Sequence, residues 1–185
     1  MAISAKTIRA CKKGNRKAIK AFYEDCSGWM LGISLRYIPD RNEAMSVVNM
    51  SLLAALDGLK KYDESRSEHI EGWLKTILVR KAIDYLRKEK MNGEAVNGEA
   101  TGETLGKVSN QGESNQRQEE LMGMVNSLPA KTRAVFNLFA IEGYKHAEIA
   151  TMLEISDGTS KWHMNEARKL LREKLEQLDR IIPVQ

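Results

Sequence analysis

The sequence predicts an all-α protein made of two small helical domains joined by a linker. Leu, Ala, Lys, Glu, Arg and Met dominate the chain, whereas proline is scarce and aromatic residues make up 6%. These are residues that favour helix. Apolar side chains recur at helical spacing in both halves, and no stretch alternates with the period of two that a half-buried strand needs. Composition and periodicity therefore agree on the fold class.

A glycine-rich, acidic segment at residues 92–115 divides the chain. It contains the tetrapeptide NGEA twice and no aromatic residue. Such a segment buries too little apolar surface to offset the entropy lost on ordering. The sequence thus predicts a first domain over residues 1–91, a flexible linker over 92–115 and a second domain over 116–185.

Four helices are predicted in each domain. Asp40, followed by Glu43, has the pattern of a capping box at a helix start. The residue before Pro129 resists helical conformation, and Gly143 ends a further helix. The predicted helices cover residues 4–12, 15–37, 40–60 and 69–90, and then 117–127, 131–142, 146–153 and 157–179.

Charge is unevenly distributed along the chain. Residues 1–90 hold 18 Lys and Arg against 11 Asp and Glu, a net charge of +7, whereas residues 91–115 have a net charge of −3 and residues 116–185 are balanced. A basic first half fits a polyanionic partner such as nucleic acid. The alternative is a solvated, lysine-rich surface.

Little in the sequence points to catalysis. Cys11 and Cys26 stand alone, which is typical of buried thiols in a reducing cytoplasm. His69, His146 and His163 lack metal-ligand spacing. No nucleophile or phosphate-loop motif occurs, and no apolar run reaches membrane-spanning length. The sequence therefore predicts a cytoplasmic protein that is not an enzyme, needs no cofactor or metal, and does not insert into a membrane.

Two short helical patterns meet at residues 154–156 and predict a helix-turn-helix. Ile149 and Leu153 are expected to face inward. Glu154 occupies a position that can require a left-handed backbone, at a cost on the order of 1 kcal/mol for this residue type.

The second helix of this unit has two different faces. Its core face is predicted to comprise Ser160, Met164, Ala167, Leu171, Leu175 and Leu178. The opposite face carries Trp162, Asn165 and Lys169, flanked by Lys161, Arg168 and Arg172. Lys and Arg meet phosphates or guanine, and Asn can pair with adenine, so this face is suited to a DNA groove. In the alternative, Trp162 packs on a neighbouring helix and the charges are only solvated.

The helix predicted at 69–90 carries a stripe that begins apolar and ends charged. The stripe consists of Trp73, Ile77, Arg80, Asp84 and Arg87, with Lys81 and Lys88 beside it. Such a surface suits contact with both bases and backbone. The alternative is that Trp73 belongs to the core and the arginines are solvated.

The helix predicted at 40–60 has apolar residues on two sides. Its core stripe is Ala44, Val48, Leu52, Ala55 and Leu59. Met50 and Leu53 fall near the opposite side, which indicates a protein partner unless another helix covers them.

Three segments together are similar to a known family. They are IRACKKGNRKAIKAFYEDCSGWMLGISLRYIPDRNEA, HIEGWLKTILVRKAIDYLRK, and LPAKTRAVFNLFAIEGYKHAEIATMLEISDGTSKWHMNEARKLLREKL. In this order and spacing they resemble the extracytoplasmic-function class of bacterial RNA polymerase sigma factors. The likeness covers nearly all of the chain outside the linker.

The resemblance implies an initiation factor without catalysis of its own. Its expected partners are RNA polymerase core, promoter DNA and an anti-sigma factor. The first domain would bind the polymerase through Glu43, Ser46, Asn49, Met50, Leu53 and Asp57. It would open the upstream-ten element with Ser65, Arg66, His69, Trp73, Arg80, Lys81, Asp84, Arg87 and Lys88. The second domain would read the upstream-thirty-five element with Thr159, Lys161, Trp162, His163, Asn165, Arg168, Lys169 and Arg172.

The sequence departs from the family pattern at several positions. The 40–60 helix has fewer acidic residues than usual, and Arg80 stands where asparagine is frequent. His163, Asn165 and Glu166 replace positions that often hold Arg, Ser and Arg. Two other functions therefore stay open: a stand-alone helix-turn-helix regulator, and a sigma-like adaptor that binds polymerase without promoter activity.

Overall fold

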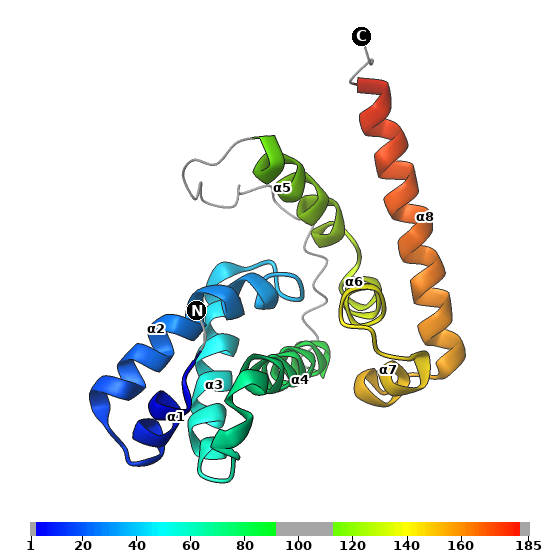
Figure 1. Cartoon of the computed structure of the whole chain (residues 1–185). Helices are drawn as coiled ribbons and strands as arrows, with labels where there is room; N and C mark the ends of the chain where they lie inside the picture. The colour runs from blue at the N-terminus through cyan, green and yellow to red at the C-terminus, as the bar shows by residue number, and fades with distance from the viewer. Residues whose placement is uncertain (1–2, 92–112, 182–185) are drawn as a thin grey trace. The chain divides into compact units, whose positions relative to one another are not determined.

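The computed structural model describes residues 3–91 and 113–181, and the side chains of residues 3–88 and 120–177. All regular structure in that part of the chain is helical, with no strand, which confirms the all-α prediction (Figure 1). The helices are α1 (Ala5–Lys12), α2 (Arg16–Ser34), α3 (Arg41–Leu59), the 3₁₀ helix η1 (Glu64–His69), α4 (Ile70–Met91), α5 (Glu113–Asn126), α6 (Ala130–Phe136), the π-helical turn η2 (Asn137–Ile141), α7 (His146–Leu153) and α8 (Asp157–Ile181).

The chain divides into two compact units, Met1–Leu86 and Arg87–Gln185. The division falls within the last turns of α4, close to the predicted domain end at residue 91. Most of the predicted linker, residues 92–112, lies outside the described residues, and residues 113–115 already belong to α5.

Side-chain caps start the first three helices. Ser4, Asn15 and Asp40 each accept hydrogen bonds from amides in the first turn of the helix that follows, at 2.9–3.1 Å. One of the two amides on Asp40 is that of Glu43, as the capping pattern predicts. These bonds satisfy amides that have no partner within the helix. Gly14 has a φ of 71°, a left-handed conformation that lets the chain turn sharply from α1 into α2.

The core of the first unit forms where α3 packs against α1 and α2. All five residues of the predicted α3 stripe are buried, so that prediction is confirmed. Other buried side chains of this core come from the neighbouring helices, among them Ile8, Phe22, Met30, Leu74 and Leu78. Cys11 and Cys26 are buried free thiols, as predicted. Burial, followed by the Asp25 carboxylate, raises the pKa of Cys26 to about 12, so this thiol is inert at neutral pH.

In the second unit, α8 packs against α6 and α7. Its core includes Val135, Leu138, Ile149, Met164 and Ala167. The residues of the predicted core face of α8 are buried through its first three turns but not beyond them. Leu175 is 45% exposed because α8 continues past the helices that cover its beginning, so the prediction that it belongs to the core is wrong. The side chain of Leu178 lies outside the described residues.

Two features of the second unit have no counterpart in the sequence predictions. The helix predicted at 131–142 widens into the π-helical turn η2 at its end. Arg133, a residue type that is mostly exposed, is buried, and burial lowers its pKa to about 10. Its guanidinium donates to the carbonyls of Asn126 at 2.7 Å and Leu128 at 3.3 Å. Arg133 thereby satisfies carbonyls where α5 ends and fastens that end to α6.

Candidate nucleic-acid interface

The helix-turn-helix consists of α7, residues 154–156 and α8. Glu154 has φ 53° and ψ 50°, the left-handed conformation that its position predicts. The chain turns there, and the amide of Ile155 donates to the Ala150 carbonyl at 3.0 Å. Ser156 then caps α8, accepting from the amide of Thr159 at 3.0 Å, while the two hydroxyl oxygens lie 2.8 Å apart. The orientation of α8 is thus set by local backbone geometry.

A buried polar contact locks α8 onto α7. Ser160, on the inner face of α8, lies with its hydroxyl 2.9 Å from Nδ1 of His146. The His146 ring stacks on Phe139 with 4.4 Å between ring centroids. A buried hydroxyl is stable only with such a partner. His146 is therefore a packing residue that holds the helix-turn-helix together.

The opposite face of α8 exposes its tryptophan, whose ring lies edge-on to that of His163 with 4.8 Å between ring centroids. Trp162 is 58% exposed, which rules out the alternative in which it packs on a neighbouring helix. Asn165, Arg168, Lys169, Arg172 and Glu173 line a shallow hollow on this face. Lys161 is exposed and pairs with Asp157 at 2.6 Å. Because exposed ion pairs contribute at most about 1 kcal/mol, Lys161 can exchange that partner for a phosphate.

Two residues predicted to contact DNA are only partly exposed. His163 is half-buried, and its Nδ1 lies 3.0 Å from the Thr132 hydroxyl on α6. Burial, followed by the Lys131 charge, lowers the pKa of His163, so the ring is mainly neutral at pH 7. Thr159 is half-buried in the cap with Ser156. The structure therefore separates these two, which orient α8, from the exposed side chains of its outer face.

In the first unit, the segment Tyr62–His69 forms a compact turn ahead of α4. The Asp63 carboxylate accepts from the amide of Ser65 at 3.0 Å and from its hydroxyl at 2.8 Å. The Tyr62 hydroxyl donates to the Arg66 carbonyl at 2.7 Å. Ser65, Arg66 and His69 are exposed. This hydrogen-bonded turn presents a hydroxyl, a guanidinium and an imidazole to solvent.

The predicted stripe on α4 is divided between packing and surface. Trp73 is half-buried, with its ring centroid 4.8 Å from that of Tyr62 and its edge against Gly58. Arg80, Asp84 and Lys88 are exposed, whereas Lys81 and Arg87 are half-buried. Trp73 thus packs against the Tyr62–His69 segment through the Tyr62 ring, and the charged part of α4 forms the accessible surface.

The outer face of α3 is exposed, as predicted. Met50 is 44% and Leu53 65% exposed, and the four polar residues predicted beside them, Glu43, Ser46, Asn49 and Asp57, are exposed too. Sequence reasoning missed Tyr23 on α2, which is 41% exposed and donates to Oδ1 of Asn49 at 3.0 Å. The sequence did contain a signal for Tyr23, because a large apolar residue stands there beside charged residues of α2.

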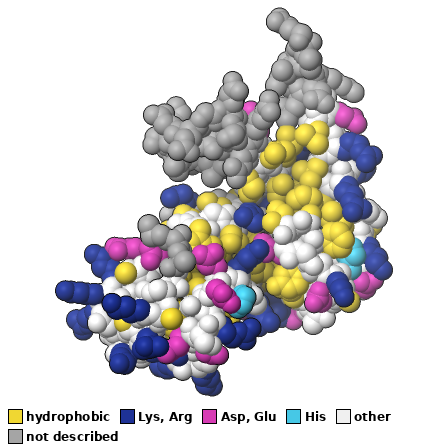
Figure 2. Space-filling view, viewed as in Figure 1, with side chains coloured by type: hydrophobic (Ala, Val, Ile, Leu, Met, Phe, Trp, Pro, Cys, Tyr) yellow, Lys and Arg dark blue, Asp and Glu magenta, His cyan; other side chains and the backbone are white. Residues whose placement is uncertain are grey.

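Figure 2 shows how the two units differ in the character of one visible face. Lys and Arg side chains are spread over the first unit, and hydrophobic side chains gather on the second.

No helix in the described ranges is long and apolar enough to cross a membrane. Within the same residues, no three His, Cys, Asp or Glu side chains are grouped as metal ligands.

Two family models match the chain in sequence. Residues 22–91 match sigma-70 region 2, and residues 118–171 match sigma-70 region 4. RNA polymerase sigma factor SigV of Bacillus subtilis (strain 168) is 29% identical over 147 residues, covering 80% of this chain and 84% of its own. The ECF RNA polymerase sigma-E factor of Salmonella typhimurium (strain LT2) is 26% identical over 184 residues, covering 94% of each chain. That of Haemophilus influenzae is 22% identical over 181 residues, covering 92% of this chain and 94% of its own.

The chain belongs to the extracytoplasmic-function class of sigma factors. It is a promoter-recognising RNA polymerase sigma factor, of a family whose members are not enzymes. In this sigma factor the region-two match contains α3, η1 and α4, and the region-four match contains α6, α7 and the first half of α8. Each surface described above therefore lies in a matched region, apart from Arg172 and Glu173, which follow the second match directly.

Proposed function

We propose that this sigma factor binds RNA polymerase core through the outer face of α3, opens the upstream-ten element with η1 and α4, and reads the upstream-thirty-five element with α8. One observation carries the proposal. A single chain combines a region-two unit that exposes Met50 and Leu53 with a region-four unit that exposes Trp162 among cations.

On α8, the proposal divides the exposed residues by chemistry. Lys161, Arg168, Lys169 and Arg172 are assigned to phosphates, because cations bind the backbone whatever the base sequence. Trp162 and Asn165 are assigned to base edges, since an aromatic ring can contact a thymine methyl and an amide can pair with adenine. The half-buried His163 and Thr159 act indirectly, by holding α8 in orientation.

Strand opening by this sigma factor has to be driven by binding, because the proposal includes no nucleotide hydrolysis by the chain. Breaking a stacked step costs roughly 1.4 kcal/mol, and extruding a base costs a few kcal/mol. The exposed Ser65, Arg66 and His69 offer hydrogen bonds to one extruded base. Arg80 and Lys88, exposed on α4, would hold the adjoining backbone. Together these contacts are of the right size to offset the cost.

The α3 face supplies the polymerase contact in this proposal. Apolar side chains that stand exposed beside polar ones are typical of a protein interface. Tyr23 extends this face through its hydrogen bond to Asn49. Once polymerase fixes the separation of the two units, two weak DNA contacts act together through effective concentration. The free sigma factor should therefore bind promoters poorly.

Run-off transcription with core polymerase is the decisive test. The chain with core should yield a promoter-dependent transcript, and neither component alone should yield one. Tight binding of the free chain to duplex promoter without a transcript would favour the stand-alone regulator. Retention of polymerase in a pull-down without promoter-dependent transcription would favour the adaptor.

Two further expectations follow from the family. The sigma factor should act in the cytoplasm, where bacterial RNA polymerase works. An anti-sigma factor is an expected partner, and one that hides Met50 and Leu53 should compete with polymerase. Adding a co-purified partner to the run-off reaction should then abolish the transcript, with recovery on addition of excess core.

A further inference from the structure

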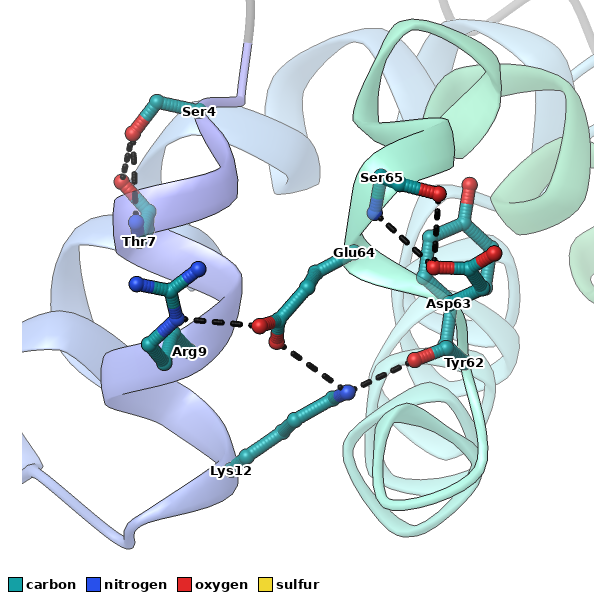
Figure 3. Close-up of polar contacts among 8 residues, drawn as sticks. All are labelled: Ser4, Thr7, Arg9, Lys12, Tyr62, Asp63, Glu64 and Ser65. Carbon is teal, nitrogen blue, oxygen red and sulfur yellow. Dashed lines mark hydrogen bonds and ion pairs between the residues drawn. The ribbon is translucent and has the colours of Figure 1, made fainter.

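A polar network joins α1 to the Tyr62–His69 segment in the first unit (Figure 3). The Arg9 Nε donates to Glu64 Oε1 at 2.9 Å, and the Lys12 Nζ lies 3.3 Å from Glu64 Oε2. Lys12 Nζ also donates to the Tyr62 carbonyl at 2.7 Å. One carboxylate therefore pairs with two cations. One of these cations also donates a hydrogen bond to the backbone at the start of the segment.

Among the hydrogen bonds and ion pairs described for the segment, those of this network reach α1, and the helices α1 and η1 also pack against each other. On the α4 side, Trp73 packs against the Tyr62 ring. Within the segment, Asp63 holds Ser65 and the Tyr62 hydroxyl holds Arg66. These contacts shape the turn but do not tie it to α1. Figure 3 shows Arg9 and Lys12 reaching across from α1 to Glu64, which lies between them and the capped turn.

We propose that Glu64 is a positioning residue for promoter opening, clamped by Arg9 and Lys12 so that Ser65 and Arg66 present their polar groups in one arrangement to the extruded base. This inference rests on the proposed function of the Tyr62–His69 segment. The clamp pre-organises the segment before DNA arrives, so less conformational entropy is lost when a base is captured.

The chemistry of the network supports a charged clamp. Hydrogen bonds from Arg9, followed by those from Lys12, lower the pKa of Glu64, so the carboxylate stays ionised throughout the neutral range. Hydrogen bonds between charged groups are stronger than neutral ones, and the one to Glu64 Oε1 comes from a guanidinium. The network ties residues 55 and 50 positions apart in sequence. It therefore acts on the placement of the segment and not on helix formation in α1.

Hydrogen exchange on the full chain tests the clamp without polymerase. Amides of residues 62–69 should exchange on the order of tenfold faster in the Arg9→Ala, Lys12→Ala double variant than in the parent chain. Lys13→Ala is the matched control, because Lys13 is exposed on the same helix end and its side chain has no ion pair with another described residue. Unchanged exchange in the double variant would overturn the proposal whatever the outcome of transcription.

Promoter selection with holoenzyme tests what the clamp does. Run-off reactions on a library randomised in the upstream-ten element report base preference at each position. Glu64→Ala should reduce the preference at one position on the order of tenfold, while preference in the upstream-thirty-five element stays unchanged. A fold merely weakened by the substitution would lower all transcripts without changing that ratio.

A mutant cycle distinguishes a clamp from direct DNA contacts by the same residues. If Arg9 acts through Glu64, the double variant Arg9→Ala, Glu64→Ala should be no worse than Glu64→Ala alone. Lys12 is left out of this cycle because it also donates to the Tyr62 carbonyl. Glu64→Gln, which keeps the shape but not the charge, should fall between the parent and Glu64→Ala. Additive losses, or an equal loss in Lys13→Ala, would mean that the cations hold phosphate, and the clamp would be rejected. A wild-type chain that yields no transcript would instead overturn the proposed function, and hydrogen exchange would still decide the clamp.

Discussion

At the scale of single residues, side chains of one type differ in role according to what they contact. His146 and His163 are both half-buried in the second unit and each meets a hydroxyl, of Ser160 and of Thr132. His69 is exposed in the first unit. The exposed histidine, whose Nε2 lies 3.3 Å from Oε1 of Glu68, is the one that an incoming base can reach. Exposure and partner, and not residue type, therefore divide the candidate site into contacting and supporting residues.

Lys161 and Asn165 should have separable effects on recognition of the upstream-thirty-five element. Lys161→Ala should weaken binding on all sequences alike and lower the salt slope by about one, because a phosphate contact carries no base information. Asn165→Ala should change the preferred base at one position, at roughly 1–3 kcal/mol. Holoenzyme binding to an element library at several salt concentrations measures both. Equal effects of both variants on all sequences would contradict the assignment.

Gly58 should be intolerant of a side chain. A Cβ there would lie 2.9 Å from Cζ2 of Trp73, so the indole has to shift or the helix has to move. Overpacking of this kind costs about 1–3 kcal/mol, measured as a loss of unfolding free energy in Gly58→Ala. Gly28→Ala is the control, because a Cβ at Gly28 meets nothing within 4 Å. Removing a helical glycine at an open site should stabilise the chain by about 0.5–1 kcal/mol. Equal changes in both variants would mean that Trp73 is not packed there.

At the scale of elements, α3 combines two surfaces on one helix. Its buried stripe builds the core with α1 and α2, while Met50 and Leu53 remain exposed. A helix with these two surfaces can bind a partner without loss of its own packing. The same principle applies to α8, whose inner face holds Ser160 and Met164 and whose outer face exposes Trp162.

The double variant Met50→Asp, Leu53→Asp should lose polymerase binding and keep its fold. Both side chains are exposed, so their replacement removes no core packing, whereas two carboxylates would be buried without partners in the interface. Pull-down with core polymerase and thermal unfolding followed by circular dichroism measure the two outcomes. Val48→Asp, at a buried position of the same helix, should unfold the first unit. Unfolding of the double variant would show that the pair belongs to the core.

At the scale of the whole molecule, the proposed function divides the promoter interface between two units. In that proposal the region-two unit uses the segment ahead of α4 for opening, and the region-four unit uses α8 for recognition of duplex DNA. Polymerase would bring both contact sets to one promoter. Opening would then be the step in which binding energy of one unit is converted into unpaired bases.

Arg80 tests this conversion. Arg80→Ala should leave polymerase binding and the closed complex intact, because neither requires unstacked bases. It should reduce the open complex, seen as lost permanganate reactivity of thymines in the opened region. A template with a pre-opened mismatch bubble should largely rescue the variant, because the bubble removes most of the unstacking cost.

The control for Arg80 is Arg80→Lys, which keeps the charge but lacks the planar group that stacks on a base. On the duplex template, Arg80→Lys should recover less open complex than the bubble template restores to Arg80→Ala. Equal impairment of Arg80→Ala on duplex and bubble templates would mean that Arg80 only holds phosphate. Full activity of Arg80→Ala on the duplex template would mean that Arg80 is only a solvated charge with no role in opening.

The sequence by itself determined the local features of this protein. Helix limits were predictable to within a few residues because caps and breakers such as Asp40 and Gly143 act on their own neighbours. The buried stripe of α3 and the exposure of Met50, Leu53 and Trp162 were predictable because helical periodicity alone decides which residues share a face. Family motifs then connected these faces with promoter recognition.

Only the tertiary structure decided which side chains support the site. The burial of His163 depends on Thr132 of another helix, and the exposure of Leu175 depends on where the covering helices end. The packing of Trp73 on Gly58 and the clamp on Glu64 join residues far apart in sequence. Periodicity describes one helix at a time, so it carries no information on which helix lies opposite, and that neighbour determines burial, hydrogen-bond partner and charge.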